Sequence, residues 1–108
     1  MFAPDGVLEI HLGEEVRGRD NIVAFLGGVG RELEATSPTR LIRHFVANVR
    51  IDVASRSRAT GASYFLALTV HGVDHWGRYR DTYVPGEADT WRFAHRLARV
   101  DGRAPHQL

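Results

Sequence analysis

The chain has 108 residues, of which 44% are hydrophobic and 25% are charged, a composition typical of a single globular domain. It contains no cysteine, which excludes disulfides, thiolate nucleophiles and cysteine-based metal sites. All 14 basic residues are arginine, so lysine Schiff-base chemistry is excluded as well. The net charge is only +1 and the arginines alternate with acids, which argues against nucleic acid as a partner.

The sequence shows neither a run of about 18 apolar residues nor a basic segment followed by an apolar one at its start. We therefore expect no membrane span and no signal peptide, and by default a cytoplasmic location. We also expect one domain over residues 1–108, with a flexible tail at residues 102–108. No cofactor and no bound metal are expected.

The first predicted elements are a short strand over residues 7–12 and, after a charged connection, a helix that begins at Asn21 behind a cap at Asp20. The apolar stripe of this helix has a period near 3.6 and consists of Ile22, Val23, Phe25, Leu26, Val29 and Leu33. The period continues through three glycines, Gly27, Gly28 and Gly30. We therefore interpret them as part of the helix and not as a phosphate-binding loop.

Four strands joined by short loops follow, which predicts an antiparallel sheet. Their expected ranges are 41–53, 58–71, 78–84 and 90–100, with residues 72–77 as a connection. A single helix against such a sheet predicts an α+β fold in which the curved sheet forms a cone around a pocket. The outer sheet face would then be buried in a homodimer.

The strand over residues 41–53 is mainly apolar but carries a few polar groups, as the wall of a ligand pocket does. Alternation places its more polar side chains on one face, namely Ile42, His44, Val46, Asn48, Arg50 and Asp52. The corresponding face of the next strand carries Ser63, Phe65, Ala67, Thr69 and His71.

Four stretches resemble the SnoaL-like branch of the nuclear transport factor 2-like superfamily: RHFVANVRIDV, ATGASYFLALTVHGV, WGRYRDTYV and TWRFAHRLARVDG. The most specific parts are the Arg43-His44 pair, residues 78–81, and Trp91-Arg92-Phe93 with Arg96. Ketosteroid isomerase, scytalone dehydratase, limonene epoxide hydrolase and the small subunits of ring-hydroxylating dioxygenases belong to this superfamily. The resemblance implies a cone-shaped α+β barrel with a pocket. The family usually begins with a helical pair that carries an aspartate, whereas this sequence begins directly at the first strand.

Within the superfamily the nearest catalytic pattern is similar to that of scytalone dehydratase, whose two strand histidines fall on His44 and His71. The resemblance implies that these two act as general acid and base, since imidazole exchanges protons near neutral pH. It also places His11 where a substrate would be oriented. The pocket lining that we expect consists of Val46, Asn48, Phe65, Thr69 and Phe93.

Two functions stay open. The first is cofactor-free dehydration, isomerisation or cyclisation of a small, apolar, oxygenated ring compound. The second is a non-catalytic dimerising or accessory subunit, as in the dioxygenases. Two further patterns have simpler interpretations: Asp74 and His75 belong to a solvated turn and not to a metal site with His71, and Asp81 forms a cross-strand ion pair with Arg80 or Arg96.

Overall fold

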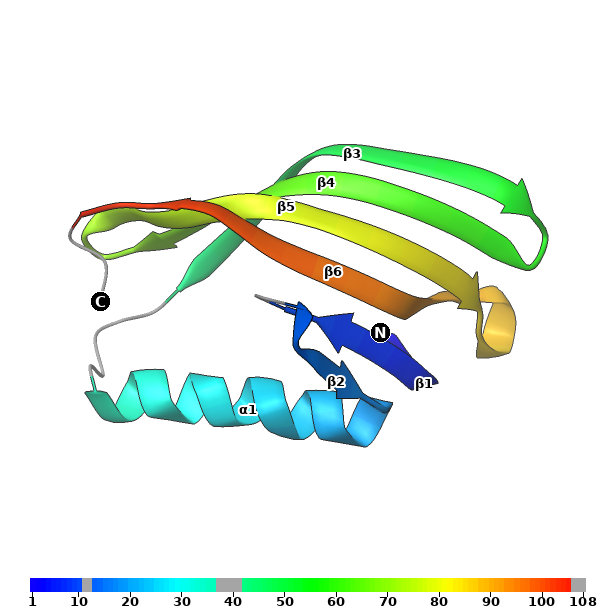
Figure 1. Cartoon of the computed structure of the whole chain (residues 1–108), viewed down its shortest axis with the longest axis horizontal. Helices are drawn as coiled ribbons and strands as arrows, with labels where there is room; N and C mark the ends of the chain where they lie inside the picture. Colours follow the sequence, from blue (N-terminus) through cyan, green and yellow to red (C-terminus); the bar gives the residue numbers. More distant parts are fainter. Residues whose placement is uncertain (11–12, 37–41, 106–108) are drawn as a thin grey trace.

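The computed structural model describes residues 1–10, 13–36 and 42–105. Six strands form one sheet in the order β2-β1-β6-β5-β4-β3, and a single long helix lies along one face of it (Figure 1). The elements are β1 (Phe2–Glu9), β2 (Glu15–Arg17), α1 (Arg19–Thr36), β3 (Arg43–Ser55), β4 (Arg58–Thr69), β5 (Gly72–Pro85), the short 3-10 helix η2 (Glu87–Asp89) and β6 (Trp91–Arg103).

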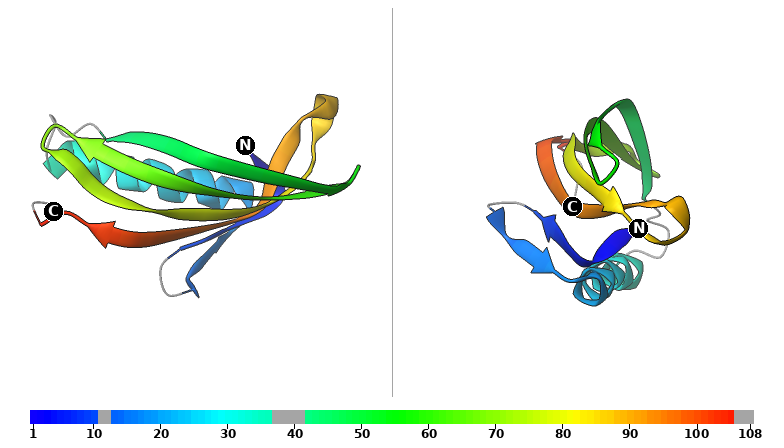
Figure 2. Two further views of the ribbon diagram at one scale, coloured as in Figure 1. Left: turned by 90° about the horizontal axis from the view of Figure 1, so that it is seen from above. Right: turned by 90° about the vertical axis from the view of Figure 1, so that its right-hand side faces the viewer.

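The sheet is curved and unclosed, and the long strands β3 to β6 arch over the helix (Figures 1 and 2). The predicted α+β fold is confirmed, but its sheet is not entirely antiparallel. β1 pairs with β6 in parallel, whereas the other neighbours pair antiparallel. Hairpin loops impose the antiparallel pairs. β1 and β6 come from opposite ends of the chain, so no hairpin sets their direction.

A small core joins the helix to the N-terminal strands. Ile22 of α1 is 1% exposed and packs against Phe2 and Leu8 of β1, which are 7% and 5% exposed. Phe93 of β6 contacts this core through Phe2, with ring centroids 5.3 Å apart. Burial of these side chains fixes α1 on β1 and β2 and orients one sheet face toward the helix.

The predicted helix is confirmed, and it continues through Gly27 and Gly28 without a break. It begins at Arg19, two residues before the predicted start, so that Asp20 lies in its first turn. Gly18 precedes it with φ of 89°, a left-handed conformation that suits glycine, and its carbonyl accepts a hydrogen bond from Ile22. No helix in the described part of the chain is both long and apolar enough to cross a membrane.

Several strand boundaries differ from the predictions. β1 begins at Phe2, β2 occupies part of the expected connection at 13–18, and β5 begins at Gly72 in the expected connection at 72–77. β6 continues to Arg103, into the expected tail. Glycine and polar residues in these segments had suggested loops, whose backbone N–H and C=O groups face solvent. In the structure, pairing with a neighbouring strand satisfies these backbone groups.

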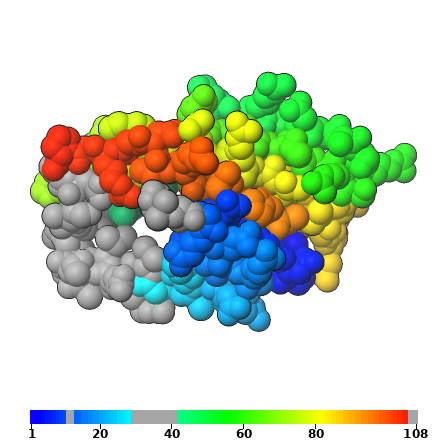
Figure 3. All heavy atoms as spheres, in the orientation of Figure 1, coloured from blue at the N-terminus to red at the C-terminus, as the bar shows by residue number. Residues whose placement is uncertain are grey.

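We call the sheet face turned toward α1 the inner face and the opposite one the outer face. In β4 the alternation is as predicted: Ser63, Phe65 and Ala67 are buried on the inner face, whereas Ala62 and Tyr64 are exposed. The space-filling view shows β6 in contact with the N-terminal elements over only part of its length (Figure 3). β3 is an edge strand whose residues are all exposed.

Candidate functional site

Three aromatic rings from three neighbouring strands meet on the inner face. His44 lies on β3, Phe65 on β4 and His75 on β5, and the strand register brings them side by side. The ring centroids are 6.1 Å apart for His44 and Phe65, 6.1 Å for His44 and His75, and 5.9 Å for Phe65 and His75. We call these three residues the ring cluster. Tyr79 extends it, stacking on Phe65 with centroids 4.7 Å apart.

A β-bulge at Asp74 positions the second histidine of the ring cluster. In β5, Val73 pairs with Leu68 and His75 pairs with the adjacent Ala67, so Asp74 is an extra residue in the register. Bulges redirect side chains in this way, often beside functional sites. The Asp74 carboxylate lies 2.8 Å from Nδ1 of His75. Because a carboxylate only accepts hydrogen bonds, Nδ1 carries the hydrogen and Nε2 is left for another partner.

The pairing of Asp74 with His75 was not predicted from the sequence. Asp74 and His75 are not in a solvated turn, because their side chains are only 12% and 18% exposed and both residues lie within β5. The Asp74 carbonyl also accepts a hydrogen bond from Ala104. The available signal was the histidine spacing itself, but the bulge that turns both side chains inward leaves no trace in the alternation of apolar residues.

The surroundings of His44 favour its neutral form. Partial desolvation of the ring lowers its pKa below the usual 6.5, and the neighbouring His75 lowers the pKa further. A neutral imidazole offers one N–H donor and one acceptor nitrogen. At neutral pH, His44 can therefore donate a hydrogen bond to a ligand oxygen without carrying a charge.

The other half of the inner face holds an ion pair among aromatic rings. Arg96 Nε lies 2.8 Å from Asp81 Oδ1, and the guanidinium carbon lies 3.8 Å and 4.2 Å from the ring centroids of Tyr79 and Phe93. Asp81 also accepts a hydrogen bond from Tyr83. Burial raises the pKa of both tyrosines above 10, so they stay protonated at neutral pH. The predicted cross-strand ion pair is confirmed, with Arg96 as the partner.

Besides Phe65, which belongs to the ring cluster, two more of the predicted pocket residues lie on the inner face. Val46 pairs with Phe65 on the inner face and is 51% exposed, so it is open to a ligand. Phe93 lies farther along this face, beneath Arg96 and against the core. These positions extend the apolar wall from the histidines toward α1.

Other predicted site residues lie elsewhere. His71 is exposed in the turn between β4 and β5, and its backbone N–H donates a hydrogen bond to the Thr69 hydroxyl at 3.2 Å. The structure thus places Thr69 at the end of β4, where its hydroxyl closes this turn. The histidine that meets His44 is His75. His11 lies outside the described residues.

A second bulge breaks the face predicted for residues 41–53. Ala47 pairs with Tyr64 but Arg50 pairs with Ala62, which leaves an extra residue in β3, and Asn48 has φ of 53°. Beyond this point the alternation is inverted, so the predicted common face is wrong after Ala47. Asn48 lines an outer-face depression whose other lining residues include Arg50, Tyr64, Arg78 and Arg80.

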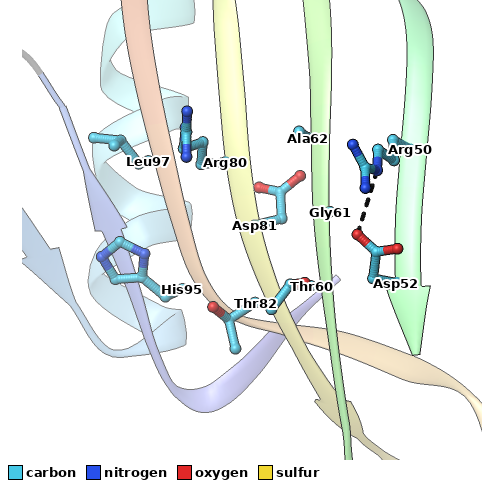
Figure 4. A pocket seen from close by; sticks show the side chains of 10 residues that line it. All are labelled: Arg50, Asp52, Thr60, Gly61, Ala62, Arg80, Asp81, Thr82, His95 and Leu97. Atoms are coloured by element: carbon cyan, nitrogen blue, oxygen red, sulfur yellow. Dashed lines mark ion pairs between the residues drawn. The ribbon is translucent and has the colours of Figure 1, made fainter. Parts of the chain in front are cut away.

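Arg50 and Asp52 consequently line a cavity of about 480 Å³ on the outer face (Figure 4). Figure 4 shows them on β3 at one side, with His95 and Leu97 of β6 at the other and Arg80 between. This cavity lies on the face opposite the ring cluster. It therefore cannot bring a ligand to His44.

One group of possible metal ligands lies at the β2–β1–β6 end of the sheet. The ligand atoms of Glu9, Glu15 and His95 all lie within 4.8 Å of one another. His95 Nε2 is 3.1 Å from Glu9, and Arg17 is 2.7 Å from Glu15. Each of these groups therefore has a protein partner, and the cluster needs no ion to balance it.

The sequence profile of the SnoaL-like domain family matches residues 1–97, and the chain belongs to this family. A comparison with curated proteins finds no match. Among solved structures, one from Catenulispora acidiphila in complex with S-DNPA is 28% identical, with a TM-score of 0.76. The match covers 93% of this chain and 73% of that protein.

Two further structures are similar at lower identity. A candidate scytalone dehydratase from Novosphingobium aromaticivorans is 24% identical, with a TM-score of 0.78, over 99% of this chain and 70% of that protein. ActVI-ORFA from Streptomyces coelicolor is 24% identical, with a TM-score of 0.76, over 93% of this chain and 77% of that protein. At these identities the likeness shows the shared fold alone.

Proposed function

We propose that the inner face binds a small, apolar, oxygenated ring compound and that the ring cluster catalyses its dehydration, isomerisation or cyclisation without a cofactor. The observation that carries this proposal is the meeting of His44 with His75, whose tautomer is set by Asp74. Phe65 and Val46 supply apolar surface beside the two imidazoles. The similar structure from Catenulispora acidiphila is a complex with S-DNPA, which supports a ligand-binding role. We expect the reaction to take place in the cytoplasm.

For a β-hydroxy ketone the chemistry is as follows. Nε2 of His75 takes the proton from the carbon next to the carbonyl, and Asp74 stabilises the imidazolium that forms. The N–H of neutral His44 donates a hydrogen bond to the carbonyl oxygen as it gains negative charge. The C–O bond then breaks, and the departing hydroxyl takes the proton from His75 to leave as water. Both histidines return to their starting form.

This assignment keeps His44 from the sequence analysis and adds His75. His71 lies in the turn between β4 and β5, whereas the rings that meet His44 are those of Phe65 and His75. The catalytic role predicted for His71 therefore needs a test of its own. If His71 acts as the acid, His71→Ala loses turnover while His75→Ala keeps it. We expect the reverse.

The first experiment is an NMR titration of the histidine rings with a panel of hydroxylated ring ketones, followed by turnover assays on any compound that binds. We expect the resonances of His44 and His75 to shift together. His75→Ala should lower kcat by about 100-fold or more, the usual contribution of a general base. Asp74→Asn should lower kcat less and should alter its pH profile, because Asp74 acts through His75. The matched control is His95→Ala, on the outer face.

Three results would contradict the proposal. The first is that no compound of the panel shifts either ring. The second is that His44→Ala turns over as fast as the unmodified protein. The third is that His44→Ala unfolds, which would make the residue structural. Circular dichroism of each variant separates loss of the fold from loss of chemistry.

The outer face supports a dimeric assembly, and with it the alternative of a non-catalytic subunit. Phe45, Leu66 and Trp76 form one row across β3, β4 and β5, and Phe45 and Trp76 are 55% and 40% exposed. A second copy of the chain would cover this row. Trp76→Arg should then convert a dimer into a monomer in light scattering, whereas Trp91→Arg, at another exposed tryptophan, should not. Dimerisation without ligand binding would favour the non-catalytic role.

A further inference from the structure

Three arginines gather on the outer face, away from the ring cluster. Arg78 and Arg80 lie on β5, and Arg99 lies on β6 directly opposite Arg78. With Leu97, which pairs with Arg80, they line a depression of about 280 Å³. The three side chains project from the same face because they occupy alternate positions of paired strands.

The charges at this depression are not balanced. Like charges directly opposite each other in a sheet are destabilising, and Arg78 and Arg99 form such a pair. Asp101 offsets part of this repulsion, since its carboxylate binds Arg78 through two hydrogen bonds of 2.8 Å and 3.0 Å. Among the side chains of residues 1–10, 13–28 and 42–105, Arg80 and Arg99 have no ion-pair partner.

Two carboxylates on other strands of the sheet are already engaged. Asp52 is 3.4 Å from Arg50, and Glu9 is 3.1 Å from His95. Neither carboxylate is therefore available to Arg80 or Arg99 without losing its own partner. Three arginines line the depression and one of them, Arg78, is paired with a carboxylate, that of Asp101, so the remaining local charge matches a dianion.

We propose that Arg78, Arg80 and Arg99 form a binding site for a small dianionic oxyanion, such as a phosphate monoester or a dicarboxylate. Planar guanidinium groups bind phosphate and carboxylate oxygens through paired hydrogen bonds. Leu97 offers an apolar surface for the carbon part of such a ligand. The site is on the face opposite His44, so it does not depend on the function proposed for the inner face.

The test is a titration with inorganic phosphate, followed through the arginine Nε–Hε resonances and repeated with sulfate, succinate and acetate. We expect saturable shifts at Arg80 and Arg99, with phosphate, sulfate and succinate binding more tightly than the monoanion acetate. Arg80→Ala or Arg99→Ala should weaken phosphate binding by about tenfold or more. The control is Arg56→Ala, an exposed arginine in the turn between β3 and β4, which should bind phosphate unchanged.

A gain of binding gives a second, independent readout. Asp101→Asn removes the carboxylate that occupies Arg78 and should tighten phosphate binding by several-fold, whereas a purely structural role of the arginines would not produce this gain. The proposal is overturned if the shifts grow linearly with added salt or if Arg56→Ala weakens binding as much as Arg80→Ala. It is also overturned if Arg80→Ala changes the oligomeric state but not phosphate binding, which would assign the arginines to a second copy of the chain.

Discussion

The two faces of the sheet use charge in opposite ways. On the inner face, the Asp81 side chain is 2% exposed and its carboxylate is fully engaged by Arg96 and Tyr83. On the outer face, the Arg78–Asp101 pair is 42% and 32% exposed, and two more arginines lie beside it without a carboxylate of their own. The inner pair therefore serves the fold, whereas the outer arginines are available to a partner.

The strongest test of this difference removes one acid from each face. Asp81→Ala should lower the free energy of unfolding by about 4 kcal/mol, because it leaves the Arg96 charge without its partner in a mostly buried site. Asp101→Ala, the matched outer-face variant, should lower it by less than about 1 kcal/mol. Urea unfolding measures both. Equal losses would show that the two faces do not differ in this respect.

Close packing beneath the ring cluster gives the next effect. A Cβ on Gly77 would overlap the Arg99 carbonyl oxygen and lie 2.7 Å from the Phe65 ring. Gly77→Ala should therefore cost about 2 kcal/mol or more and displace Phe65. Gly28→Ala is the control, since its Cβ would meet nothing within 4 Å. It should stabilise α1 by up to about 1 kcal/mol. Thermal unfolding distinguishes the two, and a neutral Gly77→Ala would contradict the packing described here.

The smallest effect is the dependence of stability on pH. Well above pH 6.5 the His44 ring is neutral in both the folded and the unfolded chain, so its titration does not change the free energy of unfolding there. Below 6.5 the unfolded chain takes up the proton more readily, because the folded-state pKa is lowered. The free energy of unfolding should therefore fall as the pH falls below 6.5, and this part of the fall should be lost in His44→Gln. The change should be small because the ring is partly in solvent. An identical pH profile for both proteins would contradict it.

Local patterns in the sequence predicted most of the fold. The 3.6-residue period located α1 in spite of Gly27 and Gly28, and the alternation in β4 separated buried Phe65 from exposed Tyr64. Both patterns depend on which side chains can be buried together in one regular element. An ion pair of Asp81 with Arg80 or Arg96 was predicted in the same way, and the ladder decided for Arg96, which is the direct partner of Asp81.

The site itself depended on irregular pairing. The bulge at Asp74 brings His75 to His44, and the shift near Asn48 moves Arg50 and Asp52 to the other face. A bulge adds one residue to one strand against its neighbour, so its position is set by the register of two segments that are distant in sequence. Residue types and local periods determined the helix, the long strands and the candidate histidine His44. Only the tertiary structure decided that His75, and not His71, meets it, because that choice depends on the pairing of β5 with β4.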